Sequence, residues 1–97
     1  MKYFETSLNV SGGIDAIAKY LELASYSGLP KSKTFKLVLE RTDGYGHSNP
    51  TTMEVIKVQR EDNRLRILQK GLLNTTVQAH PNGCSVEWCD NFYKLLL

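Results

Sequence analysis

The sequence lacks several features that would place it in a specialised class of protein. It has only two cysteines, Cys84 and Cys89, whose Cα atoms would lie roughly 16 Å apart in an extended segment, well beyond disulfide reach. No apolar run approaches the ~18 residues of a membrane span, and the first ten residues lack the apolar stretch of a signal peptide. These absences predict a cytoplasmic protein with free thiols and no membrane partner.

An excess of charge of one sign is missing as well. Twelve basic residues face ten acidic ones, so the formal charge is only +2. A dedicated nucleic-acid binder usually carries a much stronger basic bias. With 97 residues, 41% of them hydrophobic, we expect one globular domain, residues 1–97, with a single core.

Among the features that are present, residues 11–30 have the spacing of an amphipathic helix. Ser11 can cap its amino end, and Gly28 with the following Leu29-Pro30 can stop it. Apolar residues recur at intervals of three and four, which places them on one stripe of a helix: Ile14, Ile17, Ala18, Leu21 and Ala24. The segment therefore predicts an N-terminal helix with one buried face.

Most of the remaining sequence alternates apolar and polar residues, as half-buried strands do. We expect strands within residues 2–10, 33–41, 51–60, 64–69, 75–80 and 84–89. The apolar set changes parity between Val55 and Ile56, which indicates a β-bulge or two covered faces. Pro81-Asn82-Gly83 indicates a short hairpin. The predicted fold class is α+β: one helix packed across a curved, mostly antiparallel sheet of five to six strands, in the order β-α-β-β-β-β.

This order of elements resembles the cystatin-like roll over most of the chain. The resemblance is one of architecture only. Cystatins carry a Gln-Val-Val-Ala-Gly type hairpin loop and a Pro-Trp pair, whereas here the long loop reads GYGHSNP and Trp88 follows a glutamate. Protease inhibition is therefore not implied, since a shared fold does not carry a function with it.

The sequence contains no set of residues that identifies a catalytic or metal site. His47 and His80 are expected about a strand length apart, ~17 Å or more, which is too far for shared metal ligation. A pair of His80 with Cys84 remains open, with ordinary turn and core roles favoured over catalysis. Ser11-Gly12-Gly13 could attract an anion at a helix start, but a flexible turn is favoured. We expect no catalytic residue, metal or cofactor, and an enzyme is the less favoured class.

The loop of residues 43–50 is richer in recognition residues than a connection requires. Tyrosine, serine, glycine and asparagine are the residues that recognition loops favour, although a merely tolerated insertion has the same composition. We expect Tyr45, His47 and Asn49 to contact a protein partner. The favoured function is a small non-catalytic binding module of the accessory, inhibitor or immunity type. A short outer strand at the end of the sheet would also allow a homodimer.

Two other functions stay open. Four basic residues of the strands could bind nucleic acid on an exposed sheet face: Lys57, Arg60, Arg64 and Arg66. Pairing with acidic residues along solvated strands explains the same pattern and is favoured. Alternatively, a small-ligand protein or modest enzyme would have a pocket between helix and sheet, lined by Tyr20, Tyr26, Trp88 and Tyr93.

Overall fold

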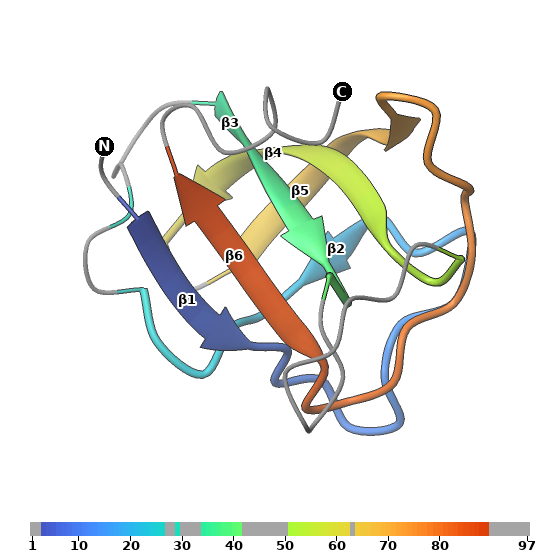
Figure 1. Cartoon of the computed structure of the whole chain (residues 1–97). Helices are drawn as coiled ribbons and strands as arrows, with labels where there is room; N and C mark the ends of the chain where they lie inside the picture. The colour runs from blue at the N-terminus through green and yellow to red at the C-terminus, as the bar shows by residue number, and fades with distance from the viewer. Residues whose placement is uncertain (1–2, 27–28, 30–33, 42–50, 63, 90–97) are drawn as a thin grey trace.

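All regular elements of the described chain are β-strands (Figure 1). The computed structural model describes residues 3–26, 29, 34–41, 51–62 and 64–89. The six strands are β1 (Tyr3–Ser7), β2 (Tyr20–Leu21), β3 (Thr34–Leu39), β4 (Glu54–Glu61), β5 (Arg64–Leu72) and β6 (Ser85–Cys89). They form one antiparallel sheet in the order β1-β6-β3-β4-β5-β2. The predicted antiparallel sheet of five to six strands is thus confirmed.

The sheet is strongly curved, and its two edge strands meet through the residues that follow them. Leu8 forms a bridge with Leu23. On either side of this bridge, the Asn9 N–H donates to the Glu22 carbonyl at 2.9 Å, and the Ala24 N–H donates to Ser7, also at 2.9 Å. In Figure 1, β5 and β2 accordingly pass behind β6 and β3. The sheet thus curves around the core, which lies on its concave side.

Alternating side chains of the central strands supply that core. Phe35 pairs with Val58, and Leu37 pairs with Ile56, across the β3–β4 ladder. Each fully buried side chain of this kind stabilises the fold by about 1.5–3 kcal/mol. Of the two explanations for the parity change between Val55 and Ile56, the structure supports two covered faces, because both residues are buried and the β3–β4 register runs through them without a shift. The β4–β5 register does shift between Val55 and Val58, but the extra residues lie in β5. The core cluster comprises Leu8, Ile14, Leu21, Leu23, Leu29, Phe35, Leu37, Leu39, Ile56, Val58, Leu65 and Val86.

The predicted N-terminal helix is wrong, and with it the α+β class. The described part of residues 11–30 contains no helix, and Ile17, in the middle of the expected apolar stripe, is 82% exposed. Leu21 and Leu23 are buried on either side of the exposed Glu22, which is the period of a strand. A helix is not needed to cover the sheet, because the sheet closes on itself and takes this segment as its last strand.

The cystatin-like order is wrong for the same reason, since it requires a helix lying in the concave face. Residues 75–80 are also not a strand. The two edges of β6 are already taken by β1 and β3, so the predicted hairpin partner finds no free edge there. Instead, His80 forms a bridge with Ile14. No helix long and apolar enough to cross a membrane occurs in the described part of the chain.

Candidate functional site

The predicted partner-contact residues Tyr45, His47 and Asn49 lie outside the described residues. Of the four basic residues predicted as a nucleic-acid surface, Lys57, Arg64 and Arg66 lie on the convex face of the sheet, which the burial pattern and the register identify. Arg60 follows the parity of the buried Val58 and lies on the other face, with its guanidinium 4.9 Å from the centroid of the Tyr26 ring. The structure thus brings three of the four together.

A buried polar cluster lies where residues 78–80 cross the end of β4. Glu54 and His80 are only 1% and 2% exposed, and Nε2 of His80 lies 2.7 Å from Oε1 of Glu54. On the other side of the ring, Nδ1 of His80 lies 3.3 Å from Oε2 of Glu40. The Glu54 carboxylate also accepts the backbone N–H groups of Gly71 at 2.9 Å and Gln78 at 3.4 Å. This carboxylate therefore fastens the long connection between β5 and β6 to the sheet.

A buried ion pair lies near this cluster, just after the end of β3. Glu87 is fully buried, and its carboxylate accepts hydrogen bonds from Nε and, at 3.0 Å, from Nη2 of Arg41. A two-point contact of this kind fixes the orientation of the guanidinium as well as neutralising the charge. The polar cluster and the ion pair thus involve the last described residues before position 42, Glu40 and Arg41.

The open hypothesis of a His80–Cys84 nucleophile is not supported by the chemistry of the thiol. Burial and the nearby Glu40 carboxylate raise the pKa of Cys84 to about 12. A thiol needs to ionise to attack, so Cys84 stays unreactive at neutral pH. His80 is itself enclosed and bonded on both ring nitrogens. The cluster therefore stabilises the fold and offers no substrate access.

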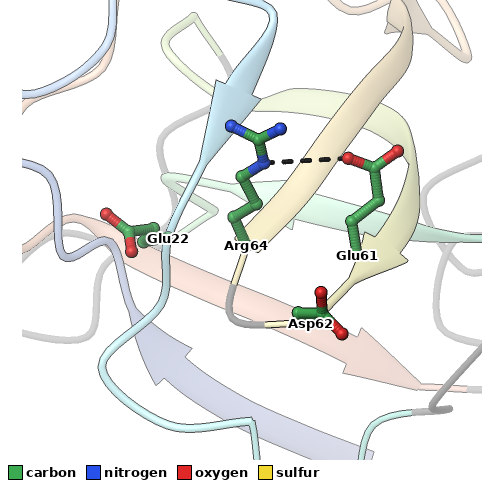
Figure 2. Close-up of a pocket in the computed structure, with 4 residues that line it drawn as sticks. All are labelled: Glu22, Glu61, Asp62 and Arg64. Atoms are coloured by element: carbon green, nitrogen blue, oxygen red, sulfur yellow. Dashed lines mark ion pairs between the residues drawn. The ribbon is translucent and has the colours of Figure 1, made fainter.

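Two adjoining hollows lie on the surface between the segment after β2 and the β4–β5 turn. The larger, about 480 Å³, is lined by Glu22, Glu61, Asp62 and Arg64. Figure 2 shows Arg64 between Glu22 and Glu61, with its ion pair to Glu61 marked by a dashed line. A second hollow of about 350 Å³ shares Glu22 and Arg64 and extends to Val10 and Tyr20. Three carboxylates and one guanidinium make this a polar cleft, unlike the mostly apolar pockets of small-ligand proteins.

The aromatic pocket expected between helix and sheet does not form, because the helix is absent. Tyr20 lies at the surface, 40% exposed. Trp88 packs edge-on against Phe35, with ring centroids 6.2 Å apart, and the hydroxyl of Tyr26 accepts the Leu23 N–H at 3.1 Å. Tyr93 lies outside the described residues. The three described aromatics therefore do not line a common pocket.

The expected anion site at Ser11-Gly12-Gly13 also loses its basis. No helix begins there, and the nearby backbone donors are used: the Gly13 N–H donates to Val10 and the Ile14 N–H to His80. Within the described ranges, no group of three or more His, Cys, Asp or Glu side chains is arranged to hold a metal ion.

Glu54 is the important residue that the sequence reasoning missed. It shares the parity of Ile56 and Val58, whose side chains are in the core. A carboxylate at a core-facing position has to find a buried partner, so this parity was a usable signal. Its partner was not readable, because His80 is 26 residues further along the chain. Comparisons of the chain with protein-family models, curated proteins and solved structures gave no match.

Proposed function

We propose that this chain is a small non-catalytic binding module whose 43–50 loop contacts a protein partner. The observation that supports the proposal is the anchoring of the residues on both sides of that loop. On one side, Arg41 is held by the buried Glu87, and Glu40 is held by His80. On the other, the carbonyl of Thr51 accepts a hydrogen bond from Nε2 of Gln78 at 3.1 Å. A recognition loop gains affinity when its base is fixed before binding.

The backbone at Glu40 adds a second reason to regard this junction as selected for function. Glu40 has a φ of +55°, the left-handed region, which is unfavourable for a residue with a side chain by about 1–2 kcal/mol. Its N–H donates to Ser85 at 2.8 Å. Strained backbone that is held by the surrounding structure is common at functional sites.

The remaining groups support binding over catalysis. The described histidine and its partner Glu54 are buried, and the raised pKa keeps the described thiol protonated at neutral pH. The partner contacts are assigned to Tyr45 as the aromatic anchor, with His47 and Asn49 as rim residues. Localisation in the cytoplasm belongs to this proposal too. A homodimer through a short outer strand is part of the same proposal, since the sheet ends in the two-residue strand β2. It remains a prediction that light scattering checks.

The test compares wild type with Tyr45→Ala in quantitative capture from nuclease-treated extract of the source cell. Loss of the anchor should weaken binding by about 1–3 kcal/mol, or 5- to 150-fold, with an unchanged melting temperature. Tyr20→Ala, which removes an exposed tyrosine elsewhere, is the matched control and should leave capture intact. A Tyr45→Ala chain that melts lower yet captures the same proteins would contradict the proposal.

A further inference from the structure

The convex face of β2, β3, β4 and β5 carries a continuous polar surface, which we call the outer face. Its members alternate with core residues along each strand, so they point away from the core. From β3 through β4 and β5 to β2, the outer face consists of Thr34, Lys36, Lys57, Gln59, Glu61, Arg64, Arg66, Gln69 and Tyr20.

Strand register makes these residues neighbours. Lys36 lies directly opposite Lys57 on the β3–β4 ladder. Gln59 lies opposite Arg66 between β4 and β5, and Arg66 lies opposite Tyr20 between β5 and β2. Side chains directly opposite on one face are about 4.5–5.5 Å apart at Cβ. The outer face is therefore one patch that crosses four strands.

The patch is basic despite the nearly neutral chain. Among the described residues, it holds four cationic side chains against two carboxylates, those of Glu61 and the exposed Glu22. Two lysines directly opposite one another repel and destabilise a sheet. Glu61 lies 3.7 Å from Arg64 and 3.6 Å from Arg66, but the arginine side chains are 53% and 49% exposed, and such pairs contribute little. The arginines stay available to an anionic ligand.

An aromatic group lies at the edge of this basic patch. The guanidinium carbon of Arg64 lies over the Tyr20 ring, 3.9 Å from its centroid. Tyr20 is 40% exposed and the Arg64 side chain 53%, so the contact is accessible from solvent. Unpaired nucleobases stack on tyrosine rings and on arginine planes, whereas the bases of a duplex are stacked on each other and cannot.

We infer that the outer face binds single-stranded nucleic acid, with a base stacked on the Arg64–Tyr20 pair and phosphates held by Lys36, Lys57 and Arg66. The inference is independent of the proposal for the 43–50 loop and uses none of its residues. It also revises the basic set expected from the sequence, because Arg60 points to the other face and Lys36 joins the group. An acidic protein segment would satisfy the cations but would leave the aromatic stack unused.

The test is fluorescence anisotropy with a labelled oligothymidylate of about twelve nucleotides, a length that covers one small-domain site. Three phosphate contacts predict that log affinity falls with log salt at a slope of about −2. Lys57→Gln and Arg66→Gln should each reduce that slope by about 0.7. Tyr20→Leu should weaken binding with the slope unchanged, because stacking releases no counterions.

A gain-of-affinity variant distinguishes the outer face from the charge of the whole chain. Glu61→Gln removes the carboxylate next to both arginines and should tighten binding about two- to fivefold. Asp15→Asn makes the same change in net charge on the exposed loop near Ile14, and its amide oxygen can still accept the Ile17 N–H. This control should bind like wild type. Melting curves of each variant verify that the fold is retained.

Several outcomes would overturn the inference. These are no binding at low salt, equal effects of Glu61→Gln and Asp15→Asn, or a duplex that binds as tightly as the single strand. Competition by polyglutamate at equal charge concentration would assign the face to acidic protein segments instead. None of these results bears on the 43–50 loop, whose test uses protein capture with nuclease present.

Discussion

Removing either member of the buried Glu54–His80 pair should destabilise the fold strongly. Both side chains are almost fully buried, and their contacting atoms are 2.7 Å apart. Replacing one by leucine leaves the other without its partner in the core, which typically costs about 3–5 kcal/mol. Glu54→Leu should cost more than His80→Leu, because it also removes the acceptor of two backbone N–H groups, those of Gly71 and Gln78.

The double variant Glu54→Leu/His80→Leu separates the pair from its surroundings. Its destabilisation should be smaller than the sum of the two single changes by about 1–3 kcal/mol, because no unpaired partner remains. Urea melts of the four proteins give the free energies of unfolding. Glu54→Gln is a milder variant for the case in which leucine prevents folding, and it should cost about 1–3 kcal/mol. Glu22→Gln, at an exposed carboxylate, should change stability by less than about 0.5 kcal/mol.

Two results would refute this reasoning. Additive single changes, within about 0.5 kcal/mol, would mean that the two side chains do not interact. A His80→Leu variant as stable as wild type would mean that the ring is solvated and that another group satisfies Glu54.

Three further predictions concern the core, the thiol and a turn. Leu21→Ala should lower the free energy of unfolding by about 2–5 kcal/mol in urea melts, whereas Ile17→Ala should be nearly neutral. Equal losses would support the helix predicted from the sequence. In a Cys89→Ser background, Cys84 should resist a thiol reagent at pH 8 and react as the pH approaches 12. Because its folded pKa is raised, stability should also fall above about pH 9; rapid labelling at pH 8 would contradict this. Gly13→Ala should destabilise the fold by more than about 1 kcal/mol, since φ is +77° and the new Cβ would lie 2.4 Å from the backbone oxygen of His80. An unchanged melting temperature would show that the backbone at Gly13 has another conformation.

The strands could be predicted from the sequence because their signal is local. Alternation along β3, β4 and β5 needs no knowledge of the rest of the chain, and the parity change between Val55 and Ile56 reflects the burial of both residues. The N-terminal segment could not be assigned in this way. Its apolar residues suit a helix, but Leu21 and Leu23 suit a strand equally well. The choice depends on the sheet curving until its edges meet at Leu8 and Leu23, a long-range event without a local signal.

The candidate surfaces were predictable to a different extent. Alternation alone places Lys57 and Arg66 on one face, and the same rule applied to Arg60, two residues after Val58, would have removed it from the set. The stack of Arg64 on Tyr20 joins residues 44 positions apart and depends on the unexpected β2–β5 pairing. Errors in topology therefore affected the aromatic part of the surface more than its charges.

The buried charges also bear on whether the proposed 43–50 contact and the convex outer face act independently. Glu54 and Glu87 are on inner strands, and their partners come from segments outside the central ladder: His80 from the β5–β6 connection and Arg41 from the end of β3. Such pairs are poor substitutes for apolar packing in stability, but they hold a connection in one orientation. Since the anchored residues adjoin the 43–50 loop and none belongs to the outer face, loss of the Glu87–Arg41 pair should disturb protein capture before it affects oligonucleotide binding.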